Sequence, residues 1–295
     1  MALANFKLLI ETGTDLSRKY IMQEENLAVM PLDLIVDGKE YKQDPAHPEL
    51  LNSVFYDKQR RGKKGEITAL HSHQIAGYML PILQNGQDIL YLGLADRMGG
   101  NLEAATKARE SLLSRFPDRK IGIVDTGCVS LGQGLLVQLC NEYIKEGHSL
   151  EEPRSFAQEK AERIHHLFVV EHPKFLRRSK TVGQFTWMLE YLFGIKPVYQ
   201  ISGGGDMIAC YKPRGVDKAF RSMAKQVEQN CQGGKVYIAH ADALSDAGKL
   251  KGLIKKQKRE LDIEIGDIGP AIGLRCGAGT VAVFYEGERR TCKRS

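Results

Sequence analysis

Histidines are the first residues of this sequence that could carry chemistry. His71 and His73 are two positions apart, so their imidazoles would share one face of a strand but diverge on a helix. The segment from Ile75 to Leu83 has helical spacing, and no acidic or cysteine cluster supplies further ligands. The pattern indicates an exposed turn, and we expect no metal site.

Cys128 is the second candidate, because it lies between an apolar run that ends at Asp125 and a helical pattern beyond Ser130. The dipole at a helix N-terminus lowers the pKa of a thiol, which would favour a nucleophile. No histidine is placed to serve as its base, so a small buried residue is the favoured interpretation. A serine triad is disfavoured because the G-x-S-x-G elbow is absent. We expect no catalytic residues.

Arg275 is the third candidate, and it lies in the glycine-rich segment Gly273–Gly279, which we interpret as a loop. Glycines permit close backbone approach, and an arginine held there could bind a carboxylate or phosphate through two parallel hydrogen bonds. A solvated arginine in an ordinary turn explains the segment equally well. The residues alone leave both interpretations open.

The elements that must position these residues form two groups. A length of 295 residues fits about two domains. In the first half, apolar runs alternate with helical patterns, which favours a parallel sheet covered by helices. These runs are 6–11, 27–36, 89–94 and 121–125. We predict an N-terminal α/β domain over 1–160, with its ligand end at the carboxyl ends of the strands.

The second half, 161–295, predicts a mixed α/β domain that contains antiparallel strands. Gly203 to Asp206 separates two short strands in the manner of a hairpin turn. A phosphate-binding loop is disfavoured there, because no helix and no Gly-Lys-Ser/Thr follow. A long helix is expected over 216–230 and a basic helix over 244–258.

Composition narrows the functional classes. Six cysteines without a CxxC pair indicate reduced thiols, and no apolar run approaches the roughly 20 residues of a membrane span. We therefore expect a cytoplasmic protein. The net charge of +6 is modest, so a solvated basic face is favoured over nucleic-acid binding, and membrane contact would be transient at most.

Several short segments, each weak by itself, become informative when their order along the chain is considered. They are Glu11-Thr12-Gly13-Thr14-Asp15-Leu16, Val29-Met30-Pro31-Leu32, Asp37-Gly38-Lys39-Glu40-Tyr41 with Asp44, Val124-Asp125-Thr126 with Ser130, Gly132 and Gly134, Gly194-Ile195-Lys196-Pro197, Arg214-Gly215, and Ile272-Gly273 with Gly277 and Gly279. Collinear and spread over essentially the whole chain, they resemble the DegV family of bacterial fatty-acid-binding proteins.

The resemblance implies a two-domain DegV-like α/β fold with an apolar ligand tunnel at the domain interface. The tunnel would hold a long-chain fatty acid and present its carboxylate to a separate ATP-dependent kinase subunit. The chain itself would be a lipid-binding protein rather than an enzyme. It would need no cofactor beyond the bound fatty acid.

The resemblance also assigns candidate site residues. The fatty-acid head group would be bound by Thr68, Gly99, Gly100, Asn101 and Arg275. Arg178 and Lys180 are candidates for phosphate or partner contacts, and Thr12, Thr126, Cys128 and Ser130 for a loop near the ligand. This sequence departs from the family pattern at Gly99, where the family has a serine, and at Arg275, where it has a histidine.

These departures replace neutral hydrogen-bonding groups with a permanent cation. We therefore expect Arg275 to bind the ligand carboxylate and keep it ionised, assisted by Thr68 and the Gly100 and Asn101 amides. The alternatives are a scaffold or sensor with no ligand or a different one, whose basic helix docks an acidic partner, and a small-molecule kinase subunit or hydrolase.

Overall fold

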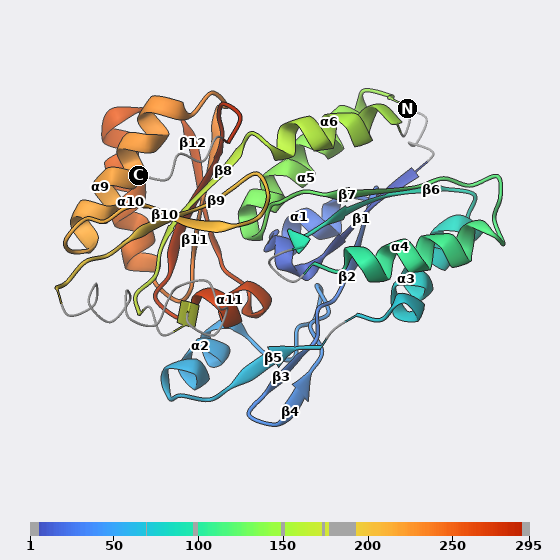
Figure 1. Ribbon diagram of the computed structural model, residues 1–295, viewed down its shortest axis with the longest axis horizontal. Helices are drawn as coiled ribbons and strands as arrows, with labels where there is room; N and C mark the ends of the chain where they lie inside the picture. Colours follow the sequence, from blue (N-terminus) through green and yellow to red (C-terminus); the bar gives the residue numbers. More distant parts are fainter. Residues whose placement is uncertain are drawn as a thin grey trace.

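The computed structural model describes residues 6–68, 70–96, 100–148, 151–172, 175–176 and 193–290. Figure 1 shows two lobes side by side, with a small sheet and a helix beneath them. The predicted two-domain α/β class is confirmed at the level of fold, since one sheet is parallel and a second is mixed.

The first lobe is built on a parallel sheet with strand order β2-β1-β6-β7. Its strands are β1 (Phe6–Glu11), β2 (Leu27–Met30), β6 (Asp88–Gly93) and β7 (Ile121–Asp125). Helices α3 (Ser72–Gln84) and α4 (Leu102–Leu113) pack on one face. Helices α1 (Arg18–Gln23), α5 (Ser130–Lys145) and α6 (Glu151–Ala161) lie on the other side (Figure 1). The short turn η1 (Thr12–Thr14) follows β1.

The predicted strand over 27–36 is wrong as a single element. The chain leaves the first sheet after β2 and enters a separate antiparallel sheet, ordered β4-β3-β5. Its strands are β3 (Leu34–Val36), β4 (Lys39–Tyr41) and β5 (Gly65–Ile67), with α2 (Asn52–Arg60) between the last two. Pro31 lies at the break, where its missing N–H would interrupt a strand ladder.

The second lobe contains a mixed sheet with strand order β10-β9-β8-β13-β11-β12. Its strands are β8 (Ile164–Val169), β9 (Val198–Ile201), β10 (Met207–Tyr211), β11 (Lys235–His240), β12 (Asp262–Asp267) and β13 (Val281–Glu286). The pair β11–β12 is parallel and the other described pairs are antiparallel. The predicted hairpin is confirmed: the Ser202 N–H donates to Asp206 O, and Gly205 has a φ of 79°.

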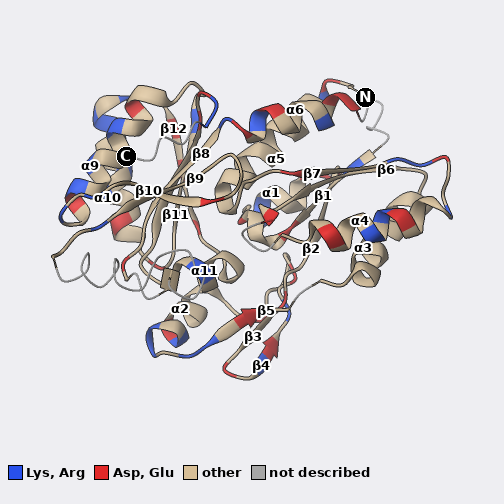
Figure 2. Cartoon of the chain, in the orientation of Figure 1, with Lys and Arg blue, Asp and Glu red and all other residues tan. Residues whose placement is uncertain are grey.

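Helices α9 (Val216–Asn230) and α10 (Leu244–Gln257) cover one face of this sheet, and α5 packs against the other. Figure 2 shows Lys and Arg on these helices as well as over the rest of the molecule. Residues 212–260, which include both helices, β11 and their loops, contain 12 Lys and Arg against 5 Asp and Glu, a net +7, whereas the whole chain carries +6. Helices α9 and α10 of this basic stretch lie across the sheet from the side that packs on α5.

The glycine-rich segment near the end of the chain is partly helical rather than a loop, which corrects the sequence interpretation. Helix α11 spans Pro270–Cys276 and places Arg275 in its last turn. Proline suits the first position of a helix because its missing N–H needs no partner there, and Gly277 ends the helix with a φ of 84°. Among the described residues, no helix is long and apolar enough to cross a membrane.

Candidate functional site

An apolar cavity lies between the second sheet, the start of α5 and helix α11. Its described lining consists of Val129, Ser130, His166, Phe168, Leu176, Ile201, Met207, Ile268, Ile272, Arg275, Cys276, Thr280, Ala282 and Phe284. The cavity is narrow, with a volume of about 40 Å³. A single water molecule needs roughly 10–15 Å³ of cavity volume, so this cavity has room for a few methylene-sized groups.

Arg275 is the one formally charged side chain in this described lining. It is half-buried, and it has no hydrogen-bond or ion-pair partner in the described part of the chain. Burial lowers the pKa of its guanidinium, which nevertheless stays protonated because an arginine side chain is not deprotonated in proteins. A cation of this kind favours an anionic ligand in the cavity.

His166 also lines the cavity, but its ring nitrogens are already used. Nδ1 lies 2.9 Å from Ile164 O and Nε2 lies 3.2 Å from Val129 N. The carbonyl requires a donor at Nδ1 and the amide an acceptor at Nε2, and burial lowers the pKa of the ring well below its usual value. Gly132 makes this packing possible, because a Cβ there would lie 2.2 Å from Nε2. His166 therefore contributes an uncharged side chain to the wall of the cavity.

The predicted head-group residues do not all lie at this cavity. In the described lining, Arg275 is present and Thr68, Gly100 and Asn101 are not. Thr68 carries a buried hydroxyl without a hydrogen-bond partner in the described chain. The Gly100 amide donates to Ala95 O at 3.2 Å. Gly99, Arg178 and Lys180 lie outside the described residues.

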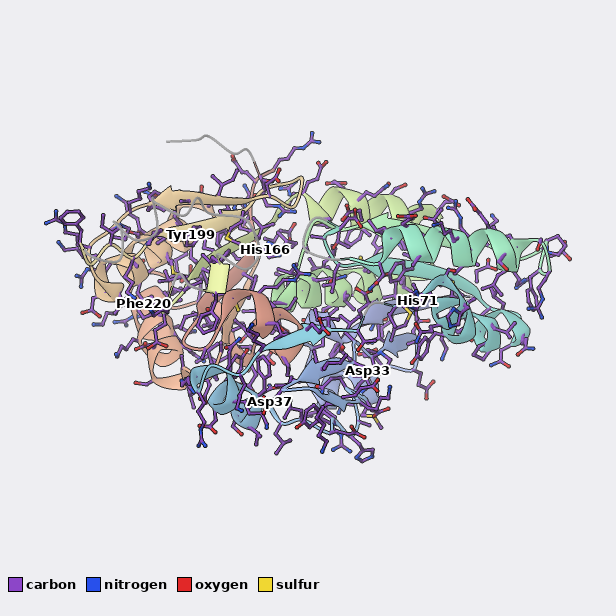
Figure 3. All side chains as sticks on the ribbon, turned by 60° about the horizontal axis from the view of Figure 1, so that its bottom comes forward. Asp33, Asp37, His71, His166, Tyr199 and Phe220 are labelled. Carbon is purple, nitrogen blue, oxygen red and sulfur yellow. The ribbon has the colours of Figure 1, made fainter. Side chains whose placement is uncertain are left out.

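Gly100 and Asn101 instead line a separate cleft of about 620 Å³, together with His71 and His73. In Figure 3, His71 lies in the first lobe, well away from His166 in the second. The imidazoles of His71 and His73 stack with ring centroids 5.8 Å apart. No group of three or more His, Cys, Asp or Glu side chains in the described chain is arranged to hold a metal ion.

Sequence reasoning missed a buried carboxyl group at the end of β1. Glu11 is fully buried and accepts hydrogen bonds from Tyr91 Oη at 2.9 Å and Asn101 Nδ2 at 2.5 Å. Burial raises its pKa. The neighbouring strands β1 and β6 form the switch point of the parallel sheet, where the chain reverses its winding direction and ligands commonly bind. The sequence signal that could have identified Glu11 was its position at the end of a strand.

The four predicted loop residues have different surroundings. Thr12 Oγ1 accepts the Leu32 N–H at 2.9 Å, and Thr126 Oγ1 donates to Gly93 O at 2.8 Å. Cys128 is fully buried, and burial raises its pKa to about 11. The favoured interpretation of Cys128 as a small buried residue is therefore confirmed, because desolvation of the thiolate outweighs the helix dipole that would have activated a nucleophile. Ser130 lines the apolar cavity.

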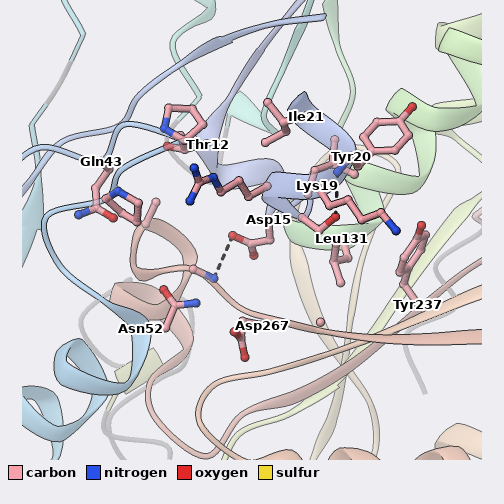
Figure 4. Close-up of a pocket in the computed structure, with 18 of the residues that line it drawn as sticks. Thr12, Asp15, Lys19, Tyr20, Ile21, Gln43, Asn52, Leu131, Tyr237 and Asp267 are labelled. Atoms are coloured by element: carbon pink, nitrogen blue, oxygen red, sulfur yellow. Dashed lines mark hydrogen bonds between the residues drawn. The ribbon is translucent and has the colours of Figure 1, made fainter. Parts of the chain in front are cut away.

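A polar cleft of about 610 Å³ opens beside the apolar cavity, between the η1–α1 segment and the β12–α11 segment. Figure 4 shows Asp15, Thr12, Gln43 and Asp267 around this cleft. The Asp15 carboxylate accepts hydrogen bonds from Ser130 Oγ at 2.5 Å and from the Gly269 N–H at 2.9 Å. Asp15 thereby connects the cleft to a residue that lines the apolar cavity.

Comparison with known proteins gives one consistent result. A family model described as "Uncharacterised protein, DegV family" matches residues 5–288. A DegV domain-containing protein of Clostridium perfringens is 30% identical over 290 residues, which cover 97% of this chain and 98% of that protein.

Solved structures show the same fold. A fatty-acid-binding DegV family protein from Streptococcus agalactiae has a TM-score of 0.82 at 24% identity, covering 96% of this chain and 99% of its own. A DegV family protein from Thermus thermophilus, described by its fatty acid binding, has a TM-score of 0.82 at 22% identity, with 95% and 99% coverage. A stearic-acid-binding protein from Eubacterium ventriosum has a TM-score of 0.82 at 17% identity, covering 95% of this chain and 98% of its own.

Proposed function

This chain belongs to the DegV family, and we propose that it binds a long-chain fatty acid in the apolar cavity with Arg275 as the contact of the carboxylate. The observation that carries the proposal is the half-buried Arg275, which has no hydrogen-bond or ion-pair partner among the described residues and lies at the wall of a cavity whose described lining is otherwise mostly apolar. Relatives of the same fold are described as binding fatty acids.

The acyl chain supplies the driving force in this proposal. Each buried methylene contributes about 0.8 kcal/mol, so a chain of about 14 methylenes gains on the order of 10 kcal/mol. The cavity of about 40 Å³ is too small for such a chain, so its walls separate on binding. Ile272 of α11 and Met207 of the edge strand β10 are apolar wall residues that can give way at little polar cost.

The head group is selected by charge. A guanidinium without a carboxylate partner offers a carboxylate two parallel hydrogen bonds, and such charge-assisted bonds are about twice as strong as neutral ones. His166 is neutral and its nitrogens are already bonded, so it offers the ligand no charge. Arg275 therefore keeps the bound carboxylate ionised.

We further propose that the bound carboxylate is presented to an ATP-dependent kinase subunit. The chain shows no P-loop signature of its own, so a phosphoryl donor would come from a partner. Tight pairing with Arg275 lowers the nucleophilicity of a carboxylate. Phosphorylation would thus be slow while that pair persists, which suits storage of the lipid.

The first test is native mass spectrometry of the purified protein, followed by solvent extraction and lipid identification. We expect a stoichiometric fatty acid. A clean apo mass, together with no uptake of added fatty acid, would contradict the proposal.

The second test separates the roles of the acyl chain and the head group. Arg275→Ala should weaken binding of a free fatty acid by about 10- to 100-fold, the value of a hydrogen bond to a charged group. Binding of the methyl ester should change little. The matched control is Arg61→Ala, since Arg61 is exposed and paired with Asp57 at 3.0 Å. Equal losses for acid and ester would rule out Arg275 as the head-group contact.

A further inference from the structure

Asp15 connects, through its hydrogen bonds, the start of α5 to the residue before α11, and these two helices form walls of the cavity in which the proposed ligand would lie. Its hydrogen-bond partner Ser130 begins α5 and lines the apolar cavity. Its other partner, Gly269, immediately precedes α11, which carries Arg275. Figure 4 shows the bond from Gly269 to Asp15 within the polar cleft. One carboxyl group thus sets the spacing between the start of α5 and α11.

The fit at this point is tight. A Cβ at Gly269 would lie 2.6 Å from Asp15 Oδ1, so any larger residue would push the carboxyl group away. Asp15 itself has a φ of 54°, a left-handed conformation that favours Asn, Asp and Gly. Both features hold the carboxyl group between the two walls.

Charged and titratable groups from several elements surround Asp15, which is partly buried. The titratable and charged groups that face it or line the same cleft are Asp267, Tyr56, Cys276, Arg18, Lys19, Tyr20, Asp44, Lys235, Tyr237 and Glu264. In the described chain, neither Arg18 nor Lys19 forms an ion pair with Asp15. Burial, assisted by Asp267, raises the pKa of Asp15 to about 7. A second carboxylate in the adjoining cavity would disfavour its ionised form further.

We propose that Asp15 is a positioning residue of the acyl site and that it takes up a proton when an ionised fatty acid binds. This rests on the proposed fatty-acid binding. The hydrogen bonds support such a role in both protonation states. Ionised Asp15 accepts from Ser130 Oγ and the Gly269 N–H, whereas neutral Asp15 donates to Ser130 Oγ and still accepts the Gly269 N–H. Protonation of Asp15 therefore removes its negative charge but keeps the two hydrogen bonds that set the spacing between the start of α5 and α11.

The consequence is a pH-dependent affinity. Well below pH 7, Asp15 is already neutral and binding carries no proton with it. Above pH 7, each bound fatty acid requires a proton, so the affinity falls by up to tenfold per pH unit. Acidification would therefore strengthen retention of the lipid, and alkaline conditions would favour its release.

The test is isothermal titration calorimetry of the full-length protein with sodium dodecanoate at pH 8. Paired titrations in phosphate and Tris buffers, which differ in ionisation enthalpy, give the number of protons taken up. We expect uptake approaching one proton for the natural protein and none for Asp15→Asn, which should also bind more tightly at pH 8. Asp267→Asn is the matched control. It removes a carboxylate that raises the pKa of Asp15, so proton uptake on binding should shift to lower pH but still occur.

Ser130→Ala gives a second measurement if Asp15→Asn fails to fold. The Ser130 hydrogen bond lowers the pKa of Asp15, so its removal should move the proton linkage to higher pH. Binding without proton uptake, an Asp15→Asn variant that retains uptake, or a Ser130→Ala variant with an unchanged pH profile would each overturn the inference. No binding of dodecanoate or of any longer fatty acid by the natural protein would instead overturn the proposed function.

Discussion

At the scale of single residues, Arg290 shows how the lobes are held together by a buried cation without a carboxylate partner in the described chain. It is 6% exposed, and its guanidinium donates to the carbonyl oxygens of Gly127, Ile201, Ser202 and Ala161 at 2.7–3.2 Å. These acceptors come from the loop before α5, the β9–β10 hairpin and the end of α6. The planar fork of arginine suits several acceptors at once, and lysine cannot reproduce it.

We predict that Arg290→Met lowers the free energy of unfolding by about 2–4 kcal/mol, because four buried carbonyl oxygens lose a charged donor and, of these, Ser202 O keeps the Gly205 N–H. Arg290→Lys should recover only part of this loss. Arg289→Met is the matched control: Arg289 is exposed and pairs with Glu162, so its removal should cost less than about 1 kcal/mol. Urea denaturation measures all three variants, and equal effects of Arg290→Met and Arg289→Met would contradict the assignment.

At the scale of elements, helix α2 covers α11 and therefore backs one wall of the apolar cavity. Gln59 is buried, and its side-chain amide donates to Gly273 O at 3.0 Å and accepts the Ala278 N–H at 2.7 Å. Tyr56 Oη donates to Ile268 O at 2.7 Å. These bonds join α2 to both ends of α11, so the position of Arg275 depends on a helix more than 200 residues away in sequence.

Replacement of Gln59 should loosen this contact locally. We predict that Gln59→Ala costs about 2 kcal/mol of stability, because it leaves the buried Ala278 N–H unpaired and removes one of the two hydrogen bonds to Gly273 O, which keeps the Gly277 N–H. Hydrogen exchange of the α2 and α11 amides should accelerate, while exchange in the parallel sheet should not change. Ser53→Ala, at an exposed position of α2, is the control. Uniform acceleration across both lobes would show that Gln59 supports the whole fold rather than this contact.

At the scale of the whole molecule, one apolar core runs through both lobes. It includes Leu8 and Leu92 of the parallel sheet, Leu136 of α5, and Tyr199 and Phe284 of the second sheet. Helix α5 lies between the sheets and is buried on most of its surface. Because α5 contributes to both lobes, neither lobe can lose its packing without disturbing the other.

We therefore predict a single cooperative thermal transition for the natural protein. Leu136→Ala should destabilise it by about 2–5 kcal/mol and keep one transition, since Leu136 is fully buried in the shared core. Glu142→Ala, exposed on the same helix, should stay within about 0.5 kcal/mol. Scanning calorimetry distinguishes the outcomes, and two separate transitions would show that the lobes unfold independently.

Much of the fold could be predicted from local pattern. Helix α9 coincides with the predicted 216–230, and the glycine run at 203–205 forms the expected hairpin. Two segments were misread for local reasons. The run 27–36 is apolar except for Asp33 yet divides at Pro31, and α11 was concealed by its glycines although Pro270 and Gly277 carry start and stop signals. The resemblance to the family was recognised from short sequence segments that follow one another in the same order along the chain.

The candidate site depended far more on tertiary structure. The sequence by itself determined that Arg275 stands in place of a neutral residue, and that Ser130 and Asp15 belong to recognisable segments. Only the folded chain decided that Arg275 and Ser130 line one cavity while Gly100 and Asn101 line another cleft. It also decided that Asp15 connects α5 to α11. The physical reason is that residue types and local periodicity are properties of short segments, whereas burial, desolvation and hydrogen-bond partnership arise between segments distant in sequence.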